Sequence, residues 1–344
     1  MNILVAVDGS ANSQAAIDAV LGMNWPEGTE IKLFSVVKGG EFFGIAAGHS
    51  HDEAMEAVRV ALKSMADELK ETLKQCDITF EVVHGDARHQ IVEQAKHWDA
   101  HLIIMGSRGN KGLDLMLLGS VSQGVLMQAS CPVLVVKYDA EREDQELQSG
   151  FQNVLITLDN SPYSRAALAW VKKMYWGPKT RFKLVTIVPS MTESMSEHET
   201  GAAASGVMHK QDALKVMARR EMESMGQELR EVFGDRVTLQ VGEGDPRETI
   251  LHIAEAWLAD LIVLGSHGRT GLNKLLLGSV SQAVAQHSTT SVAVVRGVVP
   301  PGQAGLKQTG MFQMPDIKKV VEEPVLPKKR EQDESPHIHP GGMM

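Results

Sequence analysis

The chain repeats itself, and this internal repeat constrains its fold more than any other feature of the sequence. The run ILVAVD at 3–8 resembles VLITLD at 154–159, and the segment LLGSVSQ occurs identically at 117–123 and 276–282. Each repeat is as long as an ordinary domain. The 344 residues therefore predict two α/β domains of one fold, joined head to tail.

Each copy alternates short β-branched runs with longer segments of helical period, the pattern of βαβ units around a buried parallel sheet. In the first copy we expect strands at 2–7, 31–37, 79–83, 102–106 and 133–137. Its helices should cover 13–22, 52–75, 88–97 and 119–129. The second copy should have strands near 153–158, 182–187, 237–241, 261–265 and 292–296. Ser10 and Ser161 are the expected N-caps of the first helix in each copy.

Two changes in sequence character divide the chain. The segment between the copies is acidic and polar without apolar periodicity, which is typical of an exposed linker. After Gly297, clusters of Pro and Gly with scattered charge predict a tail that is disordered or only locally ordered. The predicted parts are a first domain at 1–138, a linker at 139–151, a second domain at 152–297 and a C-terminal tail at 298–344.

Charge and hydropathy exclude several partners. The formal net charge is −9, whereas sequence-independent binding to nucleic acid or to an anionic membrane needs a basic face. No run approaches the roughly 18 apolar residues of a spanning helix, and the start of the chain reads as a strand, not as a signal peptide. We expect a cytoplasmic protein with no nucleic-acid or membrane partner.

A glycine-rich pattern follows a buried strand in each copy. It reads Gly-x-x-Gly, nine residues, then Gly-Ser, and it spans 106–120 and 265–279. Glycine lets the backbone approach a ligand closely, and the final Gly-Ser opens a helix whose free N–H groups and dipole attract anions. One such motif could be a turn that needs glycine for geometry alone. Its duplication at one spacing favours a phosphate site in each copy.

With their flanking motifs, these loops resemble the universal stress protein family in its ATP-binding branch. The flanking motifs are Asp8-Gly9-Ser10 and the run CPVLVV at 131–136, and the likeness covers about residues 1–137 and 152–297. The resemblance implies two tandem, doubly wound, Rossmann-like domains. Each would hold five parallel strands in the order 3-2-1-4-5, with ATP at the carboxyl ends of strands one and four.

The resemblance also assigns equivalent contacts in the two copies. The adenine and ribose would meet Ala6, Asp8, Val36 and Met105 in the first copy, and Thr157, Asp159, Ile187 and Leu264 in the second. The phosphates would meet Gly106, Ser107, Arg108, Gly109, Gly119, Ser120, Val121 and Ser122 in the first copy. Their equivalents in the second are Gly265, Ser266, His267, Gly268, Gly278, Ser279, Val280 and Ser281. Most of these contacts would be backbone N–H donors, with serine hydroxyls adding bonds and a candidate Mg²⁺ ligand.

Some assignments have alternatives. Asp8 and Asp159 could instead cap the turn that follows them. Arg108 and His267 differ between the copies, so either both act through their backbone alone or the two sites differ in affinity. Histidines such as His49 lack a further ligand at fixed spacing, so we assign no metal site.

Three functions fit this pattern. The first is an ATP-binding regulator of a stress response with slow or no hydrolysis, because the loops show no general base for a water molecule. The second is an adenylating enzyme, although neither copy shows a second substrate site. The third is a scaffold with empty nucleotide sites. We expect the first, and therefore no enzyme beyond at most a slow ATPase.

The last strand of each copy is strongly β-prone and would leave an exposed sheet edge. In the family, last strands of two domains pair with each other. We expect 133–137 and 292–296 to pair in this way, which would make an intramolecular pseudo-dimer. The sequence leaves open whether whole chains also form a homodimer.

Overall fold

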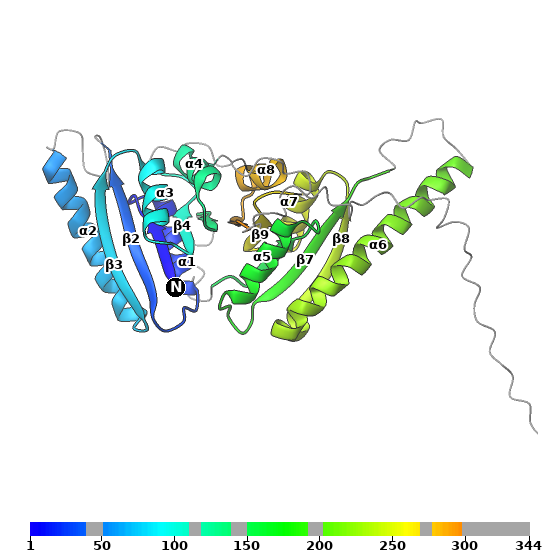
Figure 1. Ribbon diagram of the computed structural model, residues 1–344, viewed down its shortest axis with the longest axis horizontal. Helices are drawn as coiled ribbons and strands as arrows, with labels where there is room; N and C mark the ends of the chain where they lie inside the picture. The colour runs from blue at the N-terminus through cyan, green and yellow to red at the C-terminus, as the bar shows by residue number, and fades with distance from the viewer. Residues whose placement is uncertain (39–50, 110–117, 139–149, 192–201, 269–276, 298–344) are drawn as a thin grey trace, which may run out of the picture. The chain divides into compact units, whose positions relative to one another are not determined.

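The computed structural model describes residues 1–38, 51–109, 118–138, 150–191, 202–268 and 277–297. These residues form a ten-stranded sheet in the order β3-β2-β1-β4-β5-β10-β9-β6-β7-β8 (Figure 1). The predicted tail at 298–344 and most of the predicted linker lie outside the described residues, so their disorder stays a prediction.

The first half has the predicted strand order 3-2-1-4-5, with parallel neighbours throughout. Its strands are β1 (Asn2–Ala6), β2 (Thr29–Val37), β3 (Cys76–His84), β4 (Leu102–Gly106) and β5 (Val133–Val136). Its helices are α1 (Ala11–Gly22), α2 (His51–Thr72), α3 (Ala87–His97) and α4 (Ser120–Gln128).

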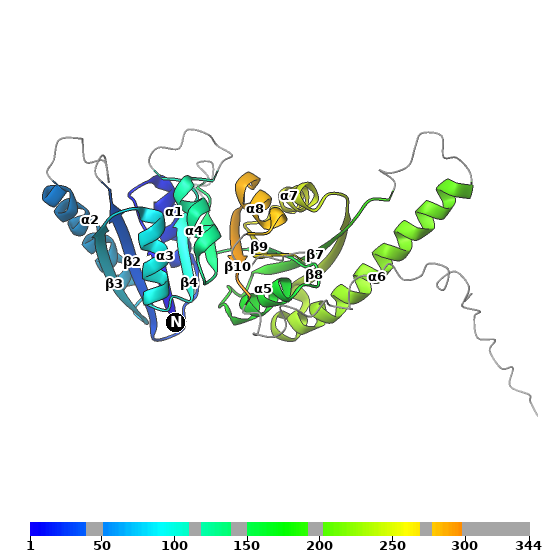
Figure 2. The same ribbon diagram turned by 45° about the horizontal axis from the view of Figure 1, so that its top comes forward.

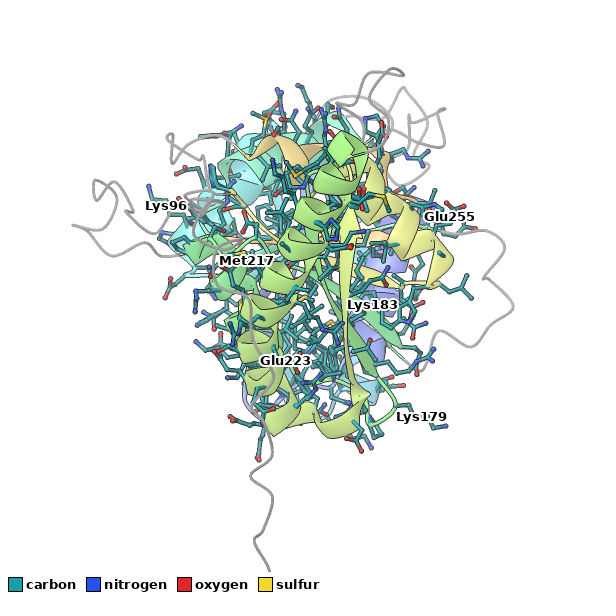
Figure 3. The ribbon with its side chains drawn as sticks, turned by 90° about the vertical axis from the view of Figure 1, so that its right-hand side faces the viewer. Lys96, Lys179, Lys183, Met217, Glu223 and Glu255 are labelled. Carbon is teal, nitrogen blue, oxygen red and sulfur yellow. The ribbon has the colours of Figure 1, made fainter. Side chains whose placement is uncertain are left out.

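The second half repeats this order with β6 as its first strand. Its strands are β6 (Asn153–Thr157), β7 (Arg181–Val188), β8 (Val237–Glu243), β9 (Leu261–Gly265) and β10 (Ser291–Val295). Its helices are α5 (Pro162–Lys173), α6 (Ala202–Phe233), α7 (Pro246–Ala256) and α8 (Ser279–His287). The halves differ most in one helix, since α6 has 32 residues and α2 has 22. Figure 3 shows α6, with Met217 and Glu223 labelled, alongside the strands of this half.

Several expected boundaries differ by one or two residues, and the largest error lies between α2 and β3. The helix predicted at 52–75 ends at Thr72, and the strand predicted from 79 begins at Cys76. Leu73 and Cys76 are both buried, at 5% and 8% exposure, so the apolar pattern continues through the turn. Hydrophobic periodicity alone could not locate the end of this helix.

Both faces of the sheet are covered, which explains the continuous apolar runs of its central strands. Ile3, Leu4 and Val5 of β1 are fully buried. Residues of α1, α2, α5 and α6 share one core cluster with the strands, and residues of α3, α4, α7 and α8 share another. Figure 2 shows helices on both sides of the strands. The result is the doubly wound α/β architecture that the sequence predicted.

The turn after the first strand of each half is built in the same way. Ser10 and Ser161 cap α1 and α5, as predicted, and each hydroxyl accepts a bond from the backbone N–H three residues on. The residue before each cap has a left-handed backbone, with φ of 75° at Gly9 and 59° at Asn160. Since asparagine tolerates this region better than other non-glycine residues, the exchange of glycine for asparagine leaves the turn intact.

The two halves join through their last strands. β5 and β10 pair in antiparallel register, with Val135 opposite Val292 and Val133 opposite Val294. Each strand therefore covers the edge that the other would expose. This confirms the predicted pairing within one chain.

Candidate functional site

A pocket of about 270 Å³ lies in the second half, at the carboxyl ends of β6 and β9. The chain leaves these neighbouring strands in opposite directions across the sheet, which is where doubly wound folds place their ligands. The pocket is lined by Thr157, Leu158, Asp159, Ser164, Val185, Ile187, Pro246, Ile250, Leu264, Gly265, His267, Gly268, Gly278, Ser279, Val280 and Ser281. The structure thus brings together every residue predicted for the second site except Ser266, a residue of the glycine loop that is buried and does not line the pocket.

Apolar side chains from three elements form one part of the lining. Val185 and Ile187 come from β7, Leu264 from β9 and Ile250 from α7. Leu264, Val185 and Ile250 are nearly fully buried, at 1%, 1% and 3% exposure. A slot of this kind suits a flat apolar ring. This apolar slot lies next to the glycine loop, so the pocket is two-ended, with an apolar end and a polar end.

The N-terminus of α8 forms the polar end. The helix starts after the N-cap Gly278, where no side chain accepts a bond from its first N–H groups. Those groups have no partner within the helix, and the helix dipole adds positive potential at the same place. Ser279 and Val280, in the first turn, line the pocket. This end is therefore suited to an anion.

Hydrogen bonds fix the loop around this helix end. Gly278 N–H donates to Ser266 O at 2.8 Å, and the Ser281 hydroxyl donates to Gly265 O at 2.6 Å. Ser266 N–H donates to Val295 O at 2.9 Å, which ties the loop to the end of β10. The cradle is consequently organised by the protein itself.

The aspartate after β6 caps its turn, and its ligand role stays a prediction. Asp159 Oδ1 accepts a bond from Ser161 N–H at 3.1 Å, so the carboxylate does cap its turn. It also lines the pocket. A Cβ at Gly268 would lie 2.9 Å from Asp159 Oδ2, so any larger residue here would push the carboxylate aside.

The first half has the same framework. Gly119 N–H donates to Ser107 O at 2.8 Å, and Ser107 N–H donates to Val136 O at 2.8 Å. The Ser122 hydroxyl donates to Gly106 O at 2.8 Å. A Cβ at Gly109 would collide with Asp8 Oδ2, as at the second site.

The other first-copy residues lie at the same edge. Ala6, Val36 and Met105 are buried near the carboxyl ends of β1, β2 and β4 and share one core cluster. Arg108 follows β4, and Ser120 and Val121 open α4 after its N-cap Gly119. The residues between the glycine pairs, 110–117 and 269–276, are outside the described part of the chain.

The position that differs between the copies has different neighbours in each. His267 is 6% exposed, its Nδ1 lies 3.1 Å from the Ser266 hydroxyl, and its ring lies 4.8 Å from that of Tyr163. In the first half, Asn12 takes the place of Tyr163, and its side-chain oxygen accepts a bond from the Ser107 hydroxyl at 2.8 Å. The copies thus differ both at this position, Arg108 or His267, and at the facing residue in the first helix of each half, Asn12 in α1 or Tyr163 in α5.

Sequence reasoning missed the pocket residues Leu158, Ser164, Val185, Pro246 and Ile250. Pro246 and Ile250 carried one usable signal, because α7 follows β8 at the carboxyl edge of the sheet.

Across the residues described by the structure, no group of three or more His, Cys, Asp or Glu side chains could hold a metal ion. Of the helices that the structure describes, none is long and apolar enough to cross a membrane.

Comparisons with known proteins agree over most of the chain. The sequence model of the universal stress protein family matches residues 1–137 and 150–296. A universal stress protein of Mycolicibacterium smegmatis is 30% identical over 310 residues, which cover 86% of this chain and 96% of that protein. A Bacillus subtilis relative, universal stress protein YxiE, is 33% identical over 144 residues, or 39% of this chain and 97% of its own length.

A similar fold is known from crystal structures. That of a universal stress protein from Archaeoglobus fulgidus has a TM-score of 0.59, covers 86% of this chain and 98% of its own, and is 24% identical. A second, of a universal stress protein described as putative from Pseudomonas aeruginosa, has a TM-score of 0.56 at 18% identity and covers 86% of this chain and 92% of its own. At these identities the likeness supports the fold alone.

Proposed function

Because this chain belongs to the universal stress protein family, we propose that each half binds one ATP and that the bound nucleotide regulates the protein. The observation that carries the proposal is the two-ended pocket of the second half. Its apolar slot suits adenine, and its open helix N-terminus suits phosphate. Asp159 lies in the lining, where a carboxylate can accept bonds from ribose hydroxyls.

The size of the pocket agrees with this ligand. Its volume of about 270 Å³ lies just below the usual range for small-molecule sites, about 300–1,000 Å³, as expected if the pocket encloses only part of the nucleotide. The base and ribose would fill the enclosed part, and the phosphates would extend along the first turn of α8. Mg²⁺ bound with ATP takes its ligands mainly from phosphates and water. The exposed hydroxyl of Ser279 is a further oxygen that this half offers to it.

We propose that ATP is held with slow or no hydrolysis. Among the residues that the structure describes, the titratable side chains in the pocket lining are Asp159 and His267. Asp159 holds the turn before α5, and His267 is packed against Tyr163 and Ser266. Both side chains support the fold of the loop, so neither is placed to aim a water molecule at the γ-phosphate.

Nucleotide-dependent unfolding tests this function. A ligand that binds only the native state adds RT ln(1 + [L]/Kd), or about 2.7 kcal/mol at a hundredfold excess over Kd. Mg-ATP should raise the unfolding midpoint of the full chain, and Mg-GTP at the same concentration should raise it less. Phosphate release should stay below about 1 s⁻¹, the lower end of common enzyme rates. A folded chain that millimolar ATP does not stabilise would rule the function out.

A further inference from the structure

Each half ends its sheet with a basic residue that reaches into the other half. Arg296 follows β10 and donates through Nη2 to the carbonyl oxygens of Leu126 and Met127, the latter at 2.9 Å. Lys137 follows β5, and its Nζ lies 3.5 Å from Ala285 O. The two basic residues occupy equivalent positions in the repeat, as do Leu126 and Ala285. The contact is therefore reciprocal.

These carbonyl groups belong to helix C-termini. In α4, Ala129 N–H donates to Val125 O at 2.8 Å and closes the helix ladder, so the carbonyls of Leu126 and Met127 receive no N–H from α4. In α8, Ser288 N–H closes the ladder on Val284 O in the same way. The C-terminus is the negative end of the helix dipole, so a cation there is favourable.

The opposite ends of the same helices are the two phosphate cradles. α4 has nine residues and spans about 13 Å from Ser120 to its last turn. Backbone hydrogen bonds connect the two ends of α4 along its length. The position of Ser120 at the first nucleotide site is thus tied to the Arg296 contact, although Arg296 belongs to the other half.

A second link returns from each basic residue to its own site. Val295, next to Arg296, accepts the bond from Ser266 N–H in the second loop. Val136, next to Lys137, accepts the corresponding bond from Ser107 N–H. A chain of hydrogen bonds and backbone therefore connects the second loop to the end of β10, Arg296, α4 and the first cradle. The equivalent chain connects the first loop through the end of β5, Lys137 and α8 to the second cradle.

We propose that Arg296 and Lys137 are positioning residues for the nucleotide site of the opposite half, and that they couple the two sites. This inference rests on the proposed function. ATP held by one loop would restrain the strand end and the basic residue beside it, so the opposite site would lose less conformational freedom when the second ATP binds. Binding should therefore show positive cooperativity, with a coupling of about fivefold, the lower end of the usual range.

Arg296 should carry more of this coupling than Lys137. Its guanidinium contacts two carbonyl groups, whereas the single Lys137 contact is long. Burial, with a contribution from nearby Arg108, lowers the pKa of Lys137 to about 8, so part of its charge is lost in mildly alkaline solution. Arginine keeps its charge throughout this range.

The experiment first separates the two sites. Ser120→Asp or Ser279→Asp places a carboxylate at the start of α4 or α8, where it repels phosphate but suits the helix dipole. Because each aspartate weakens its own site by at least about tenfold, the tight phase of a calorimetric titration with Mg-ATP reports the first site in S279D and the second site in S120D. Wild type should bind its second ATP about fivefold more tightly than expected from the affinities measured in S120D and S279D.

Arg296→Met then tests the positioning role. In the S279D chain it should weaken ATP binding about fivefold, and in the S120D chain by less than about twofold. Arg296→Lys should restore part of the affinity, because it keeps the charge but loses the second contact. Arg220→Met, on the exposed surface of α6, is the matched control and should change neither site. If R296M does not fold, R296K in S279D and Lys137→Met in S120D should still each weaken binding about twofold.

A purely structural role would weaken both sites equally or lower stability alone. Equal loss at both sites, no loss in S279D/R296M, or wild-type binding that equals the sum of the single-site chains would overturn the coupling. Absence of ATP binding in wild type would overturn the proposed function and this inference with it. Normal binding without coupling would overturn this inference only.

Discussion

Ser120→Asp and Ser279→Asp should raise the stability of the ligand-free chain while they weaken ATP binding. Both serines are exposed first residues of their helices, and neither helix has an acidic residue in its first turn. A carboxylate there interacts favourably with the helix dipole, by about 0.3–1 kcal/mol. It also occupies the positive potential that we assign to phosphate.

The expected loss of affinity follows from Coulomb's law. Two unit charges about 5 Å apart interact by about 3 kcal/mol at an effective dielectric constant of about 20. Because the serines are exposed, solvent and salt screening reduce this to roughly 1.5–2 kcal/mol. Each substitution should therefore weaken ATP at its own site by about tenfold to thirtyfold.

Calorimetry at low salt measures the affinity, and chemical unfolding measures the stability. Ser120→Ala and Ser279→Ala remove the hydroxyl without adding charge and should cost less affinity than the aspartates. Asn24→Asp adds the same charge just after the C-terminus of α1, at the amino edge of the sheet, so it should leave ATP affinity unchanged and should not raise stability. Full ATP affinity in S279D, or an S279D chain less stable than wild type, would refute the reasoning.

Three further outcomes follow from the structure. Gly268→Ala should weaken ATP binding at the second site about tenfold, because the added Cβ displaces the Asp159 carboxylate and the loss is on the scale of one charge-assisted hydrogen bond. In calorimetry, Gly206→Ala on α6 is the control, because its added Cβ meets open space. Ser281→Ala removes the bond to Gly265 O and should cost about 1 kcal/mol in urea unfolding, so an unchanged midpoint would contradict it. Burial and Arg108 lower the pKa of Lys137 from 10.5 to about 8 in the folded state. The contribution of Lys137 to the free energy of unfolding should therefore stay flat below pH 8 and rise by up to about 3 kcal/mol between about pH 8 and 10.5. Lys137→Met should remove this rise.

The fold could be predicted closely because its signals are local and repeated. The buried central strands read as continuous apolar runs, and the caps Ser10 and Ser161 mark helix starts by residue type. The end of α2 could not be placed, since Leu73 and Cys76 continue the apolar pattern into the turn. Burial by tertiary contacts and helical periodicity look alike in a single sequence.

The candidate site could be predicted only in part. Loop residues such as Gly278 and Ser279 are recognisable because glycine and a helix start have local signatures. The apolar wall from Val185 and Ile250 was missed, because it depends on how β7 and α7 lie across the sheet. The reach of Arg296 into the other half was also invisible, since no local pattern encodes a contact with α4.

The number of ATP molecules bound per chain tests the central claim most directly. Native mass spectrometry of the full chain with Mg-ATP counts the bound nucleotides directly. At about three times the wild-type Kd, the most populated species should carry two ATP in wild type, one in S120D, one in S279D and none in the double variant. A folded wild-type chain that carries no ATP, or single variants that still carry two, would contradict the claim that each half holds one nucleotide.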